Sequence, residues 1–394
     1  MFPISAPPRD HRMVDTSKAR CCDGSVSDTT TTSNALPVNA ALCVEQETLT
    51  RLGRILRHLA VGLVDQSVSL RLLSCDPRVE SLSLGPIQTI VHEKLRWPVA
   101  RRHLKRLIEV LSHQPPTVVH AMSAGSYRNA ALIAKEFDAD LVLHVTSLED
   151  CDAMAGAGLE GVGYYIAISQ PLQGRLVDQV GVTPEDIELI RPGILAPTRT
   201  ACFSDTSRVP ALLCTSDLER GGGVDVLIET VDLLRKRHIN VMVFLLGKGS
   251  WERTLRRRIH RQGLSPFFTI ASPMGDLSQA MQSADLFVRP SVDSAFFVNG
   301  LMAMAVGAAI VTFENTACDH YRDGETAIIC PEPTAACLAD TIERLIQEPA
   351  YTRSIATRGQ QHIETNHAMS AMAERTAAVY RRLALKRATI SIRE

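Results

Sequence analysis

The chain has 394 residues, of which 45% are hydrophobic and 22% charged, and 42 Lys and Arg residues against 43 Asp and Glu residues give a formal net charge of −1. This length exceeds what one hydrophobic core usually serves, so we expect two domains in an ordinary globular protein. A near-zero charge argues against a dedicated nucleic-acid binder, which normally carries a basic excess. No apolar run approaches the roughly 20 residues of a membrane-spanning helix.

The ten cysteines follow no paired spacing, and no Cys-x-x-Cys motif occurs. We therefore expect neither a disulfide framework nor a zinc site, and no other metal site. The first residues, MFPISAPPRDHR, lack the apolar segment of a secretory signal. These features predict a protein of the reducing cytoplasm.

Residues 1–38 are expected to form a disordered tail, because a segment such as Asp28–Asn34 has no apolar periodicity. From residue 39 onward, short apolar runs alternate with helical patterns, the first of which has Leu52, Ile55, Leu56, Leu59 and Leu63 on one face. The strands expected in the first half are 41–44, 69–73, 87–91, 117–121, 141–145 and 164–168. Strands that alternate with helices predict parallel pairing and a doubly wound α/β sheet.

A break follows at Arg191–Pro197, where two prolines and a glycine are typical of an interdomain linker. The alternation then restarts, with strands expected at 210–214, 239–246, 267–270, 286–289, 309–313 and 327–330. We expect an N-terminal domain over 39–192, a linker over 193–209, a C-terminal domain over 210–375, and a C-terminal helix and tail over 376–394. Two such domains facing each other create a cleft at the carboxyl ends of both sheets, where ligands of open α/β sheets bind.

Short motifs from residue 187 onward follow one another in a defined order. They are Ile187–Ile194 (IELIRPGI), Gly223–Glu229 (GVDVLIE), Leu246–Gly249 (LGKG), Ala284–Ser291 (ADLFVRPS), Ala303–Gly307 (AMAVG), and Asp323–Gly324 with Ala327–Ile329. Together they resemble glycosyltransferase family 4, or glycosyl transferases group 1, over about residues 40–385. An ordered set of this kind is far more specific than any one of its motifs.

This resemblance implies the GT-B fold, in which two Rossmann-like, doubly wound domains face each other and a C-terminal helix crosses back to the first domain. It also implies transfer of a sugar, with retention, from a nucleotide-sugar donor on the C-terminal domain to an acceptor held mainly by the N-terminal domain. The nucleotide sugar is then a substrate, and no separate cofactor and no nucleic-acid partner are expected.

The resemblance further implies site residues, and several of them are substituted here. The family's loop Arg and Lys, which meet the charge of the departing diphosphate, fall on Asp217 and Gly222. Its two glutamates fall on Ser294 and Met302, and a methionine offers a ribose no strong acceptor. The family's Thr-x-His order is reversed in His144-Val145-Thr146. The catalytic candidates that the resemblance leaves are His144, Thr146 and Ser294.

Other residues are candidates for holding the donor in place of those that are lost. A glycine run ahead of a helix offers backbone N–H groups to a phosphate, and three nearby cations could balance its charge. The donor-binding candidates are Arg220, Gly221, Gly222, Gly223, Lys248, Arg289 and Met302.

Each candidate also has a structural alternative. The glycines could form a flexible turn, and Arg220 and Lys248 could be solvated loop residues. Arg289 could pair with Asp285 or Asp293, and Met302 could belong to a helix core. His144 and His120 could be satisfied strand histidines.

Basic residues surround Trp97 in the segment 94–106. This pattern predicts a peripheral contact with the inner face of a membrane, and its alternative is a solvated helix face. Three functions remain open at this point. The first is a divergent retaining glycosyltransferase, the second a catalytically inactive relative that acts as a binding or scaffolding partner in glycan biosynthesis, and the third a GT-B enzyme with another ligand.

Overall fold

The computed structural model describes residues 37–93, 100–157, 163–195, 201–272, 277–292 and 296–391. Most of the tail expected over 1–38 lies outside these residues. The same is true of Ser294, Asp293 and positions 94–99 of the expected membrane-contact segment.

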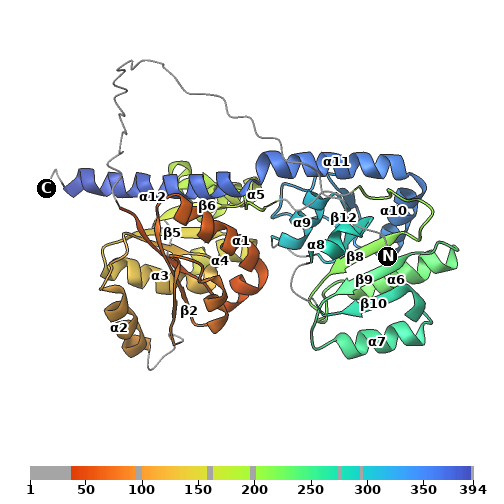
Figure 1. The fold of residues 1–394 in the computed structure, drawn as a ribbon, viewed down its shortest axis with the longest axis horizontal. Coiled ribbons are helices and arrows are strands. Elements are labelled where there is room, and N and C mark those ends of the chain that lie inside the picture. The colour runs from red at the N-terminus through yellow and green to blue at the C-terminus, as the bar shows by residue number, and fades with distance from the viewer. Residues whose placement is uncertain are drawn as a thin grey trace, which may run out of the picture. The chain divides into compact units, whose positions relative to one another are not determined.

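The first half forms a seven-stranded parallel sheet with the strand order β3-β2-β1-β4-β5-β6-β7. Strands β2, β5 and β6 of this sheet are labelled in Figure 1. Its strands are β1 (Asn39–Cys43), β2 (Ser69–Ser74), β3 (Gln88–Val91), β4 (Val118–Ala121), β5 (Asp140–Val145), β6 (Tyr164–Ala167) and β7 (Ile187–Leu189). The six strands expected from apolar runs are confirmed, and β7 is additional. Strands such as β4 are buried at every position, as expected for a parallel sheet with both faces covered.

Helices connect these strands. They are α1 (Gln46–Asp65), α2 (Ala100–Leu111), α3 (Ala124–Glu136), α4 (Leu148–Ala157) and α5 (Gln170–Arg175), with shorter helical turns at Pro77–Leu82, Leu176–Val180 and Pro184–Asp186. The apolar stripe expected on α1 is buried from Leu52 to Leu63. On α2, the side chains of Arg102, Lys105 and Arg106 are exposed.

The second half forms a six-stranded parallel sheet with the order β10-β9-β8-β11-β12-β13. Its strands are β8 (Ala211–Thr215), β9 (Met242–Leu246), β10 (Phe268–Ala271), β11 (Leu286–Arg289), β12 (Ala309–Phe313) and β13 (Ile328–Cys330). All six were expected from the sequence. The helices are α6 (Val224–Lys236), α7 (Glu252–Arg261), α8 (Ser278–Gln282), α9 (Val298–Val306), α10 (Ala335–Gln347) and α11 (Pro349–Asn366).

The chain then returns to the first sheet through α12 (Met369–Ser391), which packs against α1. Just before α12, the Nδ1 atom of His367 lies 2.8 Å from the carbonyl oxygen of Pro192, and Ile194 N–H donates to the carbonyl of His367 at 2.9 Å. A Cβ atom at Gly193 would lie 2.6 Å from the carbonyl oxygen of Ala368, so this crossing requires glycine. Within the ranges described, no helix is long and apolar enough to cross a bilayer.

Both sheets reverse their strand order at an internal position. In the first sheet this happens between β1 and β4, and in the second between β8 and β11. Loops that leave neighbouring strands in opposite directions open a crevice beyond the carboxyl ends, and ligands of such sheets bind there. The loops after β1, β4, β8 and β11 are therefore where a site is expected.

Candidate functional site

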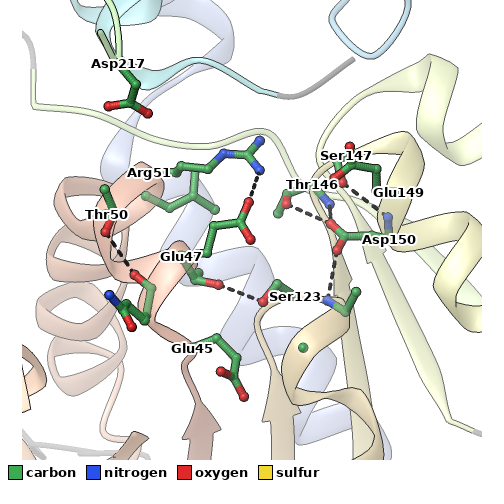
Figure 2. A pocket seen from close by; sticks show the side chains of 15 residues that line it. Glu45, Glu47, Thr50, Arg51, Ser123, Thr146, Ser147, Glu149, Asp150 and Asp217 are labelled. Carbon is green, nitrogen blue, oxygen red and sulfur yellow. Dashed lines mark hydrogen bonds and ion pairs between the residues drawn. The ribbon is translucent and has the colours of Figure 1, made fainter. Parts of the chain in front are cut away.

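A cavity of about 490 Å³ lies at the carboxyl ends of β1, β4 and β5 (Figure 2). Its walls are the first turn of α1, the start of α3 and the β5–α4 loop, and Asp217 from the loop after β8 also lines it. Thr146 was predicted from the sequence as a catalytic candidate, and it lines this cavity. The cavity thus occupies the switch point of the first sheet.

Asp150 organises one wall of this cavity. Its Oδ2 atom accepts hydrogen bonds from the backbone N–H and the hydroxyl of Thr146, both at 2.8 Å. Its Oδ1 atom accepts the backbone N–H of Ala124, at the start of α3, at 2.8 Å. The side chain is only 4% exposed. One buried carboxylate therefore fixes the end of β5 against the amino end of α3.

The rest of the cavity is acidic. Glu45, Glu47 and Glu149 line it together with Asp150 and Asp217. Arg51 also lines it, and its Nη1 atom lies 2.9 Å from Glu47 Oε1. Figure 2 shows this pair, with Asp217 on a separate loop. Carboxylates surround the space without an equal number of cations, so it favours neutral or cationic groups over phosphate.

The wall between α1 and α3 is held by short polar contacts. Thr48 Oγ1 and Ser123 Oγ lie 2.7 Å apart. A Cβ atom at Gly125 would lie 3.0 Å from Cγ of Glu45, so the Glu45 side chain lies close against the first turn of α3. A carboxylate near a helix amino end is favourable, because unpaired N–H groups and the helix dipole are positive there.

His144 lies two residues before Thr146 on β5 and is 7% exposed. Burial lowers the pKa of His144 to about 4, so the imidazole is neutral at pH 7. The carbonyl oxygen of Thr146 accepts the backbone N–H of Phe296 at 3.3 Å. Phe296 therefore lies against the end of β5.

The glycine run forms a constrained turn before α6. Gly221 and Gly223 have φ angles of +86° and +81°. A Cβ atom at Gly223 would collide with the carbonyl of Pro290, while one at Gly221 would meet nothing within 4 Å. Gly222 lies against the carbonyl oxygen of Asp217, 2.8 Å from where its Cβ would be. The glycine run brings the start of α6 close to the end of β11. The glycines are therefore needed for this close approach, and they do not merely form a flexible turn.

Two of the predicted cations are exposed on neighbouring loops. Arg220 lies 6.0 Å from the centroid of the Trp251 ring, measured from its guanidinium carbon. Lys248 is exposed, and its carbonyl oxygen accepts the backbone N–H of Leu218 at 3.2 Å. This hydrogen bond joins the loop after β8 to the loop after β9.

Arg289 and Met302 are buried, each 2% exposed. The guanidinium carbon of Arg289 lies 5.0 Å from the centroid of the Phe297 ring, at the carboxyl end of β11. Asp285 lies at the other end of that strand, where Arg208 Nη2 and Phe203 N donate to its Oδ1 atom. Met302 belongs to the hydrophobic core.

No group of three or more His, Cys, Asp or Glu side chains is placed to hold a metal ion in the part of the chain that the structure describes. The residue that sequence reasoning missed is Asp150. Its signal was the pattern Ser147-x-x-Asp150 at the start of α4, which is a helix-start signature. Ser147 Oγ indeed accepts the backbone N–H of Asp150 at 3.2 Å.

Residues 209–348 match the family described as glycosyl transferases group 1. A curated relative, D-inositol 3-phosphate glycosyltransferase of Arthrobacter sp. (strain FB24), is 29% identical over 237 residues, which cover 56% of this chain and 55% of the relative. Alpha-D-kanosaminyltransferase of Streptomyces kanamyceticus is 24% identical over 179 residues, covering 45% and 46% of the two chains. The chain thus spans about half the length of the curated relatives it matches.

Solved structures extend this likeness over most of the chain. A glycosyltransferase from Rickettsia africae ESF-5 has a TM-score of 0.74 at 14% identity, covering 89% of this chain and 99% of that one. Anabaena HepE in complex with UDP-glucose has a TM-score of 0.71 at 15% identity, covering 86% and 98%. At such low identity these likenesses show the fold, which is GT-B.

Proposed function

This chain is a member of the glycosyl transferases group 1 family with the GT-B fold, and on that premise we propose that it is a retaining glycosyltransferase. Its donor is a nucleotide sugar held by the second sheet, and its acceptor enters the acidic cavity of the first sheet. The observation that carries this proposal is the position of that cavity. It lies at a switch point, and Asp217 from the loop after β8 lines it together with Thr146 and Asp150.

The donor diphosphate binds at the glycine turn in this proposal. Backbone N–H groups at the start of α6 face the phosphate, as helix amino ends commonly do. Gly223 begins this helix without a side-chain cap, so no side chain of its own occupies that position. Arg220 and Lys248, on the two neighbouring loops, supply positive charge. The buried Arg289 extends this positive region at the end of β11.

The transfer step follows from the stereochemistry of retention. The acceptor hydroxyl oxygen forms a bond to the anomeric carbon on the face from which the diphosphate leaves. The bond between that carbon and the phosphate oxygen breaks, and its electron pair goes to the diphosphate. The acceptor proton passes to the same departing oxygen. With a pKa lowered to about 4, His144 is too weak a base to remove this proton, and Thr146, which lines the cavity, orients the acceptor.

The acceptor in this proposal carries no phosphate. Asp150 already accepts the N–H of Ala124 at the start of α3, and Glu45 lies against the same turn. The position where an acceptor phosphate would bind best is therefore occupied by protein carboxylates. A neutral or amine-bearing polyol suits the cavity instead.

A catalytically inactive binding protein is the second candidate. Asp217 lining the cavity and Met302 in the core are the observations that favour it, because a carboxylate repels a diphosphate and a methionine offers a ribose no strong acceptor. Cytoplasmic location and a membrane contact through 94–106 remain proposals as well, with the exposed Arg102, Lys105 and Arg106 of α2 as their basis.

Calorimetric titration with UDP and GDP separates the two candidates. The transferase proposal expects saturable binding that Arg220→Ala weakens, whereas Arg253→Ala, an exposed arginine on α7, leaves it unchanged. Absence of binding at millimolar nucleotide would favour the inactive protein. If the protein bound UDP or GDP tightly and Arg220→Ala did not change the Kd, the diphosphate would not bind at the glycine turn.

A further inference from the structure

Three buried side chains form a hydrogen-bonded row between the C-terminal helix and the end of β5. Tyr380 Oη on α12 lies 2.6 Å from His120 Nδ1 on β4. His120 Nε2 lies 3.2 Å from His144 Nδ1 on β5. The two imidazole planes differ by only 19°, with centroids 5.3 Å apart. The rings therefore meet nearly edge to edge, as a hydrogen bond between ring nitrogens requires.

The three side chains of the row are buried, so they donate and accept hydrogen bonds mainly among themselves. Tyr380 and His120 are fully buried, and His144 is 7% exposed. The pKa values of both histidines are lowered by burial, and that of Tyr380 is raised by burial, so all three groups are neutral at pH 7. A neutral imidazole has one N–H donor and one acceptor nitrogen. The row can then run in only two directions.

The two directions differ at the tyrosine. If Tyr380 donates to His120 Nδ1, then His120 Nε2–H donates to His144 Nδ1, and His144 carries its proton on Nε2. If the row runs the other way, the Tyr380 hydroxyl accepts from His120 and its own proton needs another acceptor. His120 is the hydrogen-bond partner of the Tyr380 hydroxyl among the described residues. A buried hydroxyl proton without an acceptor is costly, so the first direction is favoured.

We propose that Tyr380 and His120 are positioning residues that hold His144 as the Nε2–H tautomer, a neutral hydrogen-bond donor at the end of β5. The role of this donor toward a substrate rests on the proposed function, whereas the tautomer itself does not. His144 then donates to a neutral or anionic oxygen in the cleft and does not act as a base. The crossing helix thereby contributes to the site without contacting the cavity.

The row ends two residues before the cavity-lining Thr146. His144 is the second-last residue of β5, and Thr146, which lines the cavity, follows the end of that strand. The carbonyl of His144 accepts the hydroxyl of Tyr127 from α3 at 2.7 Å, which anchors the backbone from the opposite side of the sheet. The imidazole is therefore fixed both along its ring edge and through its backbone.

The experiment is two-dimensional ¹⁵N–¹H spectroscopy of ring-labelled histidine in the full chain at pH 7. The signals of His144 and His120 are assigned by their loss in His144→Gln and His120→Gln. In the unsubstituted protein we expect His144 and His120 each to show only the Nε2–H tautomer. If His144 in the unsubstituted protein gave the signal of the Nδ1–H tautomer, the proposal would be wrong. This test needs no substitution of Tyr380.

Tyr380→Phe removes the hydroxyl that sets the direction, and we expect the His144 signal to change from one tautomer to a mixture. The matched control is Tyr164→Phe, because the Tyr164 hydroxyl also bonds to α12, through Arg382, but lies outside the row. An unchanged His144 tautomer in folded Tyr380→Phe would also overturn the proposal.

The link to function has its own readout. If a nucleotide sugar is turned over, Tyr380→Phe lowers kcat severalfold and leaves the Kd for nucleoside diphosphate unchanged. If Tyr380→Phe changed the His144 tautomer but not kcat, His144 would have no role toward the substrate. The proposed function would not be affected by that result. Absence of turnover in the unsubstituted protein would count against the proposed function, while the tautomer result stands by itself.

Discussion

The carboxylate of Asp150 receives both the backbone N–H and the hydroxyl of Thr146, each at 2.8 Å, and in addition the N–H of Ala124. Asp150→Ala leaves these donors without an acceptor in a buried site. We expect the free energy of unfolding to fall by roughly 3 kcal/mol, the cost of unsatisfied buried hydrogen-bonding groups. Urea unfolding followed by circular dichroism measures this loss.

The control is Glu149→Gln, one position earlier in the same cavity, where the side chain is exposed. Its unfolding midpoint should stay close to that of the unsubstituted protein. Equal stability of Asp150→Ala and Glu149→Gln would show that Asp150 does not organise the wall.

The glycine turn offers a matched pair of substitutions. Gly221 and Gly223 share a positive φ, but only at Gly223 would a Cβ collide with Pro290. We expect Gly221→Ala to cost about 1 kcal/mol from backbone conformation alone. Gly223→Ala should cost more than about 3 kcal/mol, because overpacking adds to the strain. Thermal unfolding measures the stability of both variants. Similar losses of stability in the two would contradict the close approach of Gly223 to the end of β11.

The alternation of apolar runs with helical stripes was sufficient to predict both sheets, because buried parallel strands read as continuous apolar segments. Strand β7 (Ile187–Leu189) was missed, since three residues between Pro184 and Pro192 give no periodic signal. Its pairing with β6 comes from the sheet and not from local propensity.

Long-range polar contacts could not be predicted in the same way. The bond between His120 and Tyr380 joins residues 260 positions apart, and it exists because the chain crosses back to the first sheet after His367. The sequence identified His120 and His144 as strand histidines, but nothing local distinguished a satisfied histidine from one held for a purpose. Ser294, a predicted catalytic candidate, stays a prediction.

Asp217 carries the clearest electrostatic prediction. Asp217→Asn should tighten the binding of nucleoside diphosphate roughly threefold to tenfold, because removing one charge near a diphosphate in a solvated cleft changes the binding free energy by about 1 kcal/mol. Asp217→Glu, which keeps the charge, should bind as the unsubstituted protein does. Calorimetry at constant salt measures both, and an unchanged Kd for Asp217→Asn would place the diphosphate elsewhere.

Acid should destabilise the crossing between the linker and α12. Burial lowers the pKa of His367 to about 4, so its imidazole is neutral in the folded protein, while the unfolded chain takes up a proton below about pH 6.5. Stability is therefore lost as pH falls from 6.5 toward 4, at up to about 1.4 kcal/mol per pH unit for this group. The groups around it are His320, His362, Arg191, Asp319 and the carbonyl of Pro192.

His367→Asn keeps an N–H donor for Pro192 but cannot titrate. The decline in unfolding free energy between pH 7 and pH 5 should become less steep in this variant, measured by urea titration at each pH. The pKa of buried His320 is also lowered, so part of the decline in unfolding free energy with falling pH should persist in this variant. Identical slopes in the two proteins would show that His367 is not held neutral.

The acidic cavity predicts a preference among ligands of one shape. Glucosamine, glucose and glucose 6-phosphate differ in charge on the same ring, and saturation-transfer NMR can rank their binding. We expect the amine to bind at least as well as the neutral sugar and the phosphate to bind worst. Glu149→Gln should weaken only the amine. Preferred binding of glucose 6-phosphate would contradict the proposed acceptor class.

We propose that this GT-B chain transfers a sugar from a nucleotide donor with retention. Proton NMR of UDP- and GDP-sugar turnover, recorded before the released sugar equilibrates, reports both donor cleavage and the configuration of the first product. We expect a product with the anomeric configuration of the donor, formed faster when a neutral or amine-bearing polyol is present. An inverted product, or no cleavage at millimolar donor with any acceptor, would contradict it.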